Sequence, residues 1–201
     1  GLADNGSIDG YSGATALGIA ALEGMNGINS NFTWGQTFFG QIPGSIGETS
    51  TFLILLAGAY MVYTKIASWR IIFGTLAGMI VMSSALNLIG SDTNPMFAIP
   101  WYWHLTIGSF AFGLVYMATE PVSAANTNMG RWIYGISIGV IVVLIRVINP
   151  AFPEGMMLAI LFANLLAPAI DFTITSLNTS RRMERYNLSL IHISEPTRLE
   201  S

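Results

Sequence analysis

The chain has 201 residues, of which 52% are hydrophobic and 9% are charged, and its formal net charge is −3. A soluble domain typically carries about 25% charged residues, so this composition excludes an ordinary soluble domain and predicts an integral membrane protein. The chain has no cysteine, which excludes disulfides and thiolate metal ligands, and its two histidines are too few for a histidine-based metal site. We therefore expect no metal site, and the weak net charge gives no reason to expect a nucleic-acid partner.

The predicted segment 1–49 contains a polar motif, DGYSGAT, at residues 9–15, which ends at Thr15. Two interpretations remain open from these residues alone. In the first, Asp9 or Ser12 caps a helix that follows a turn. In the second, the Thr15 hydroxyl is exposed among small neighbours, where an enzyme could form a phosphoester on it. The four-residue spacing by itself favours the turn.

A second unusual stretch, GQIPGSIGETS, precedes the apolar part of the chain. It contains Pro43, Gly44 and Gly47, which disfavour a helix. Non-helical backbone at membrane depth is tolerated where it is buried in protein or lines a cavity, so the stretch predicts a short half-helix or a re-entrant loop. Glu48 is then either a polar residue of an ion path or a helix-start residue favoured by the helix dipole.

Five later segments are apolar over the roughly 20 residues that a membrane helix needs. We predict an all-α integral membrane protein with a five-helix transmembrane domain over residues 50–176. Small residues within it would let the helices approach closely, among them Gly74, Gly78, Gly135 and Gly139. The predicted spans are residues 50–68, 70–90, 102–119, 132–149 and 155–175.

Ionisable residues in membrane spans are costly, so each is a functional candidate. Glu120 ends the third span, and Asp171 lies in the fifth, shortly after Pro168. Their carboxylates could bind Na⁺ or relay protons, because hard cations prefer oxygen ligands; the alternative is an interfacial carboxylate paired with a base. Arg146 is expected to pack, to snorkel, to pair with a carboxylate or to face an anionic cofactor group, and His104 is expected at the membrane interface.

Basic residues lie on one side of the predicted spans. Lys65 and Arg70 lie around the connection between the first two spans, Arg131 lies between the third and fourth, and three arginines follow the fifth, in residues 177–187. The remaining connections carry no lysine or arginine. Positive charge marks the cytoplasmic side, so the C-terminal end is expected in the cytoplasm and residues 1–49 outside, in the periplasm of a bacterium.

The last residues, 188–201, begin with LSLIHISEPTR. This string looks like an in-frame translation of a transposase-type sequencing adapter, so we expect the native chain to end near Asn187 and exclude the tail from functional argument. No signal peptide precedes Gly1, and the chain is expected to be a fragment of a longer protein.

Four long stretches resemble one family. From residue 1 to about Asn187 the chain resembles the B-type subunits of the sodium-pumping NADH:quinone oxidoreductase (Na⁺-NQR) and, more distantly, the D-type subunits of the Rnf electron-transport complex. One departure is Glu120, where the family is expected to favour aspartate. The stretches are SIDGYSGATALG, GQIPGSIGETS, NPMFAIPWYWHLTIGSFAFGLVYMATEPVSA and VVLIRVINPAFPEGMMLAILFANLLAPAIDF.

The resemblance implies a ten-helix subunit made of two inverted-repeat-like halves of five helices, of which this chain is the second, with the periplasmic segment before it. It implies FMN esterified to Thr15 by a flavin transferase, within a motif that includes Asp9, Ser12, Gly13 and Ala14. Riboflavin and ubiquinone belong with the full subunit. Electrons from NADH would arrive through the other membrane and flavin or iron–sulfur subunits and pass to quinone while Na⁺ leaves the bacterial cell across the inner membrane.

Two other functions compete with this one. An Rnf-type electron-transport subunit would share much of the sequence pattern. A passive transporter or channel without flavin is also compatible with helix halves arranged around a broken-helix site.

Overall fold

The computed structural model describes residues 15–91, 93–149 and 153–194, with side chains described up to residue 186. Within these ranges every regular element is a helix, which confirms the predicted all-α class. Three helices are long and apolar enough to cross a membrane. They are α4 (Trp69–Ile89), α7 (Asn128–Ile148) and α8 (Met156–Ser194), the last over its part up to Tyr186. They coincide with the second, fourth and fifth predicted spans.

Glycines bring the backbones of α4 and α7 into direct contact, as the small residues predicted. A Cβ built on Gly139 would lie 2.1 Å from the carbonyl oxygen of Thr75, and one on Gly78 would lie 2.4 Å from the carbonyl oxygen of Ile136. Any side chain at these positions would therefore push the two helices apart. On its other side, α7 is joined to α8 by a hydrogen bond from the Tyr134 hydroxyl to Asn164 Oδ1, 2.5 Å long.

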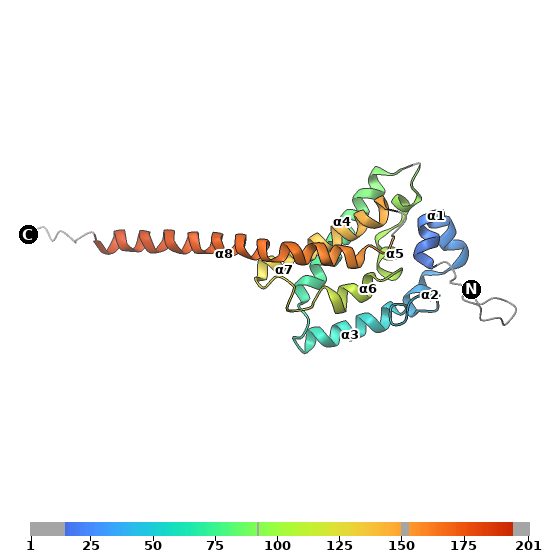
Figure 1. Cartoon of the computed structure of the whole chain (residues 1–201), viewed down its shortest axis with the longest axis horizontal. Helices are drawn as coiled ribbons and strands as arrows, with labels where there is room; N and C mark the ends of the chain where they lie inside the picture. The colour runs from blue at the N-terminus through green and yellow to red at the C-terminus, as the bar shows by residue number, and fades with distance from the viewer. Residues whose placement is uncertain (1–14, 92, 150–152, 195–201) are drawn as a thin grey trace, which may run out of the picture.

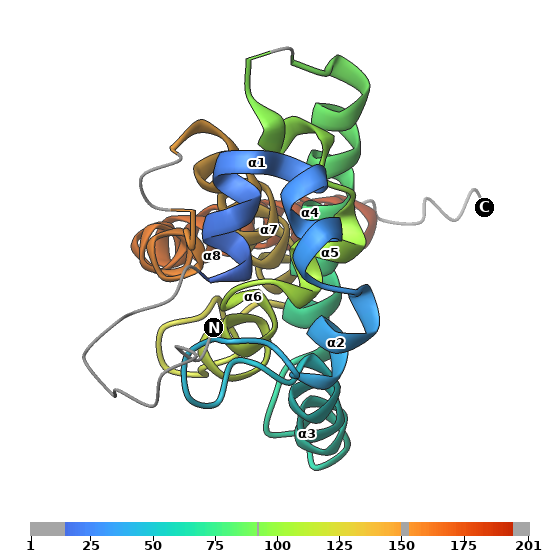
Figure 2. The same cartoon turned by 90° about the vertical axis from the view of Figure 1, so that its right-hand side faces the viewer.

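Helix α1 (Ala16–Asn31) arches over one end of these long helices (Figure 2). It is interrupted at Gly24, which has φ 62° and ψ −145°. A Cβ on Gly24 would lie 3.0 Å from the carbonyl oxygen of Pro95, the first residue of the 3₁₀ helix η1 (Pro95–Ala98). Only glycine combines this left-handed φ with so close an approach, so the arch depends on it.

The stretch predicted to interrupt helices does so. It follows α2 (Trp34–Phe39), which begins with a capping box between Thr33 and Gln36 and ends at Gly40 in the left-handed region. Residues 41–50 form no regular helix, and α3 (Thr51–Tyr63) then runs for 13 residues. At 1.5 Å per residue α3 is about 20 Å long, shorter than the roughly 30 Å apolar core of a bilayer.

The third predicted span, residues 102–119, is wrong as a continuous helix. The structure divides this segment into α5 (Trp101–Thr106), α6 (Phe110–Phe112) and the π-helical turn η2 (Gly113–Met117). The break falls at Gly108, whose φ is +71°. The described residues thus contain three helices of spanning length, whereas the sequence predicted five. The other two predicted spans correspond to α3, which is shorter, and to this broken segment.

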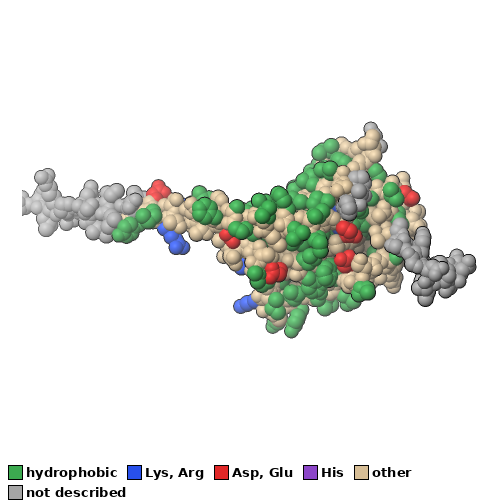
Figure 3. Space-filling model, in the orientation of Figure 1, with side chains coloured by type: hydrophobic (Ala, Val, Ile, Leu, Met, Phe, Trp, Pro, Cys, Tyr) green, Lys and Arg blue, Asp and Glu red, His purple; other side chains and the backbone are tan. Residues whose placement is uncertain are grey.

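The molecule is elongated and has two different ends (Figure 1). α1 and α2 lie together at one end, and α8 projects far beyond the other helices at the opposite end. Hydrophobic side chains are spread over the visible face between them, and the basic side chains on that face lie toward the projecting end (Figure 3). The sequence predicts that the transmembrane domain ends at 176/177 and that the native chain ends at 187/188. Helix α8 continues through both positions, so the structure marks neither boundary and both stay predictions.

Candidate functional site

Thr15 lies at the α1 end, is exposed, and is itself the N-cap of α1. Its hydroxyl oxygen accepts a hydrogen bond from the backbone N–H of Gly18 at 3.1 Å. The expectation that Asp9 or Ser12 caps this helix is therefore wrong, because the helix begins at Ala16. Together with Gly13 and Ala14, these two motif residues lie outside the described residues. The exposed hydroxyl of Thr15 agrees with the access that a modifying enzyme would need.

A small cavity of about 30 Å³ lies beside Thr15. It has room for a water molecule or a small ion but is far too small for a flavin ring. Two carboxylate residues reach it, Glu48 from the stretch before α3 and Glu154 from the turn before α8. The remaining lining includes backbone and side chains of Leu17, Ile42, Pro43, Gly44, Thr106 and Gly108. The structure thus brings together Thr15 and Glu48, which the sequence analysis treated as separate candidates.

Partial burial and the negative charge of Glu154 raise the pKa of Glu48 above its usual value. The protonated form of Glu48 is therefore more favourable here than in a fully exposed glutamate. Of the two causes, burial is the larger and the neighbouring carboxylate of Glu154 is the smaller.

Arg146 and Glu154 hold the two sides of the break at Gly108. Arg146 is fully buried and donates from Nη1 to the carbonyl oxygen of His104 at 2.8 Å and from Nη2 to that of Ile107 at 3.1 Å. A third hydrogen bond joins its Nε to the Glu154 carbonyl oxygen at 3.4 Å. The carbonyls of His104 and Ile107 lie where α5 ends, so the guanidinium supplies donors that a continuous helix would have provided.

On the far side of the break, Glu154 Oε2 accepts from the backbone N–H of Ser109 at 2.9 Å and from its hydroxyl at 2.6 Å. This places a negative charge where α6 begins and a positive charge where α5 ends, as helix dipoles favour. Of the roles considered for Arg146, snorkelling does not fit, because its side chain is fully buried and donates to backbone carbonyl oxygens. His104 is also buried rather than interfacial, with 1% of its surface exposed.

Sequence reasoning missed Glu154. It lies in a connection that was noted only for lacking lysine and arginine. One feature of the sequence could have identified it. Glu154 is an acid in a short loop with proline and glycine, and this loop directly follows the predicted span that contains the cation Arg146.

Glu120 and Asp171 lie at the opposite end, where they shape the loop between η2 and α7. Glu120 accepts hydrogen bonds from the backbone N–H groups of Val122 and Ser123 and from the Ser123 hydroxyl. These hydrogen bonds, the one from the Ser123 hydroxyl foremost, lower the pKa of Glu120. The three ion-path candidates are therefore split, with Glu48 at the Thr15 end and the other two carboxylates here.

Asp171 reaches the same loop from α8. Its Oδ2 accepts from the Asn126 backbone N–H at 2.6 Å, and its Oδ1 accepts from the Thr127 hydroxyl at 2.6 Å and the Thr127 backbone N–H at 3.1 Å. Thr127 is in turn the N-cap of α7. Asp171 thus ties α8 to the start of α7. Among the described residues no group of three or more histidine, cysteine or acidic side chains is arranged to hold a metal ion.

The sequence profile of the family described as NQR2, RnfD, RnfE matches residues 3–179. Curated relatives named as the B-type subunit of Na(+)-translocating NADH-quinone reductase are similar over most of the chain. The protein of Azotobacter vinelandii is 61% identical over 180 residues, covering 89% of this chain and 45% of the relative. That of Neisseria meningitidis serogroup A is 58% identical over 186 residues, covering 90% and 45%. The chain therefore spans about half the length of the curated relatives it matches, and it belongs to the NQR2, RnfD, RnfE family.

Proposed function

We propose that this chain is the flavin-bearing half of a membrane subunit of a Na⁺-translocating NADH-quinone reductase. The observation that carries the proposal is 61% identity, over 89% of the chain, to a relative named as the B-type subunit of that enzyme. In this function, electrons from NADH arrive through partner subunits and pass toward ubiquinone, and Na⁺ is the transported substrate. Riboflavin and the quinone belong to the full subunit, which is about twice as long as this chain.

The residues around Thr15 fit a phosphoester-linked FMN at its attachment point. The hydroxyl is exposed, and it stands at the N-terminus of α1, where backbone N–H groups and the helix dipole favour a phosphate. FMN would supply one- and two-electron chemistry, while Thr15 and α1 would fix its position. The ring would lie outside the small cavity, because about 30 Å³ cannot enclose it.

We also propose that the Thr15 end faces the periplasm and that the basic end faces the cytoplasm of a bacterial inner membrane. Support comes from the grouping of charges. Lys65 and Arg131 line one cavity at the end from which α8 projects, whereas Thr15 and Glu154 line another at the α1 end. This is the division that the positive-inside rule requires.

The flavin is tested by in-gel fluorescence after denaturing electrophoresis of the full-length subunit, co-expressed with a flavin transferase. Wild type is expected to fluoresce, and Thr15→Val is expected to lose the signal completely. The matched control is Thr33→Val, because Thr33 is also an exposed N-cap threonine, on α2, and its loss removes a cap without touching Thr15. A dark wild-type band would reject the flavoprotein. A signal that survives Thr15→Val would move the attachment elsewhere.

The proposed Na⁺ path includes Asp171, Glu120 and Glu48. Asp171→Ala is expected to slow Na⁺-stimulated quinone reduction by about tenfold, the effect of losing one charge-assisted interaction, and to slow it more than Asp171→Glu. Glu184→Ala, which changes an exposed acid further along α8, is the control and should leave the rate unchanged. Rates are measured against Na⁺ concentration. An unchanged Na⁺ dependence in both Asp171 variants would remove this residue from the path.

A passive transporter is the second candidate, and the broken segment between α5 and α6 favours it. Discontinuous membrane helices with charged groups at their ends are typical of transporter binding sites. The same gel separates the candidates, because a passive transporter would carry no flavin on Thr15. An Rnf-type subunit would be separated by its electron donor in the assembled complex.

A further inference from the structure

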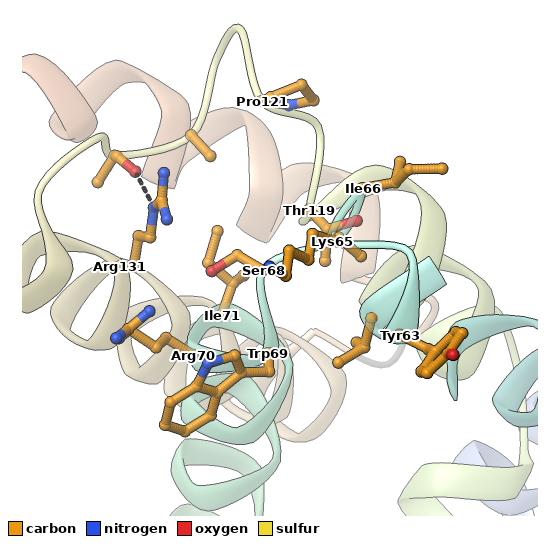
Figure 4. A pocket seen from close by; sticks show the side chains of 14 residues that line it. Tyr63, Lys65, Ile66, Ser68, Trp69, Arg70, Ile71, Thr119, Pro121 and Arg131 are labelled. Atoms are coloured by element: carbon orange, nitrogen blue, oxygen red, sulfur yellow. Dashed lines mark hydrogen bonds between the residues drawn. The ribbon is translucent and has the colours of Figure 1, made fainter. Parts of the chain in front are cut away.

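A cavity of about 520 Å³ lies at the basic end of the molecule and takes no part in the proposed flavin or Na⁺ functions. Its walls come from three places in the chain (Figure 4). They are the loop between α3 and α4 with the first turn of α4, the loop that follows η2, and the first turn of α7. Because loops from distant parts of the sequence converge here, the cavity is a product of the fold rather than of one segment.

The charges that line this cavity are all positive. Lys65, Arg70 and Arg131 contribute to the walls, and no aspartate or glutamate does. Among the described residues none of the three forms an ion pair within 4 Å, although Asp171 acts on Arg131 from a longer distance. Arg131 donates from Nε to the carbonyl oxygen of Ala125 at 3.3 Å, which fixes its guanidinium at the cavity wall. A cavity with three cations and no carboxylate in its walls favours an anion.

The N-terminus of α4 adds partial positive charge to the same wall. Its N-cap, Ser68, makes no side-chain capping hydrogen bond, although it lines the cavity. The Ser68 hydroxyl oxygen is buried and has no hydrogen-bond partner within the described ranges. A buried hydroxyl without a partner is costly, and a ligand oxygen would satisfy it. The helix dipole of this 21-residue helix favours negative charge at the same place.

Lys65 lies in the turn that ends α3. It has φ 62°, and it is the one non-glycine residue with positive φ among those described. The backbone N–H groups of Lys65 and Ile66 donate to the carbonyl oxygens of Val62 and Met61, both at 3.0 Å, as in the Schellman turn that commonly ends a helix. Here it closes the turn that carries the ammonium group to the cavity.

We propose that this cavity binds a phosphate group, held by Lys65, Arg131, the Ser68 hydroxyl and the first turn of α4. The phosphate belongs either to an anionic lipid head group or to a free phosphate. The cavity opens beside exposed apolar side chains, Tyr63 and Trp69 among them, as at a membrane surface where head groups lie. Arg70 contributes long-range attraction, since its guanidinium stacks over the Trp69 ring at 4.8 Å.

The test uses the purified complex that contains the full-length subunit and has two arms. In the lipid arm, native mass spectrometry follows retention of phosphatidylglycerol against phosphatidylcholine. In the phosphate arm, isothermal titration calorimetry follows inorganic phosphate against chloride at equal ionic strength, which controls for screening. Saturable binding in the first arm identifies a lipid head group, and saturable binding in the second identifies a free phosphate. Absence of saturable binding in both arms overturns the proposal.

Three variants test the residues. Lys65→Gln is expected to weaken binding by about tenfold, the effect of one charge-assisted contact. Ser68→Asp supplies a carboxylate at the N-terminus of α4, so it should abolish binding while keeping or raising thermal stability. Arg182→Gln removes an exposed basic residue of α8 outside the cavity and should bind as wild type. Unchanged binding in Ser68→Asp, or equal losses in Lys65→Gln and Arg182→Gln, would overturn the proposal.

Discussion

Replacing Arg146 with methionine should lower the free energy of unfolding of the full-length subunit by about 3 kcal/mol. Methionine keeps much of the length but has no donor. The carbonyl oxygens of His104 and Ile107, which now accept hydrogen bonds of 2.8 and 3.1 Å, would be left without the donors that Arg146 provides. Each unsatisfied buried carbonyl costs roughly 1–3 kcal/mol, partly offset by relief of the buried charge.

Unfolding in mixed micelles of increasing denaturing detergent would measure this change. Arg182→Met, at an exposed arginine on α8, is the matched control and should stay within about 0.5 kcal/mol of wild type. Arg146→Lys should fall between the two, because a single ammonium cannot reach carbonyls that a planar guanidinium contacts together. A stable Arg146→Met protein would show that the break at Gly108 holds without the buried cation.

Gly139→Ala should destabilise the subunit by about 2 kcal/mol, although alanine is the better helix former by roughly 1 kcal/mol. Its Cβ would lie 2.1 Å from the carbonyl oxygen of Thr75 and 2.6 Å from the backbone nitrogen of Met79. Both are backbone atoms of α4, so no side-chain rotation relieves the clash and the helices must separate.

The same measurement on Gly35→Ala provides the control. Gly35 lies in α2, and a Cβ there would meet no atom within 4 Å. This variant should be as stable as wild type or slightly more stable. Equal stability of the two alanine variants would mean that α4 and α7 do not pack as closely as the structure shows.

The long helices could be predicted because their causes are local. α4, α7 and the apolar part of α8 each contain enough consecutive apolar residues to cross a bilayer, and hydropathy depends only on which residues are near one another in sequence. The close approach of α4 and α7 was also foreseeable, since glycines four residues apart leave one helix face bare.

The broken third segment could not be predicted in this way. Residues 102–119 are mostly apolar, and what interrupts them is Gly108 together with Arg146 and Glu154, about 40 residues later in the chain. The contacts of the acids could not be predicted for the same reason. Sequence identifies Glu120 as a costly charge, but the N–H groups that it contacts become visible only once the loop is folded.

The sequence by itself determined the all-α membrane class, the three long spans, the segregation of basic residues and the family resemblance. It also singled out Thr15, although not that this residue caps α1. Only the tertiary structure decided that Glu48 and Glu154 share a cavity with Thr15, that Arg146 holds a helix break, and that Lys65 and Arg131 line one cavity with Ser68, whose hydroxyl has no partner among the described residues. The physical reason is that apolar length and charge bias act along the chain, whereas hydrogen-bond satisfaction of buried groups is decided between segments far apart in sequence.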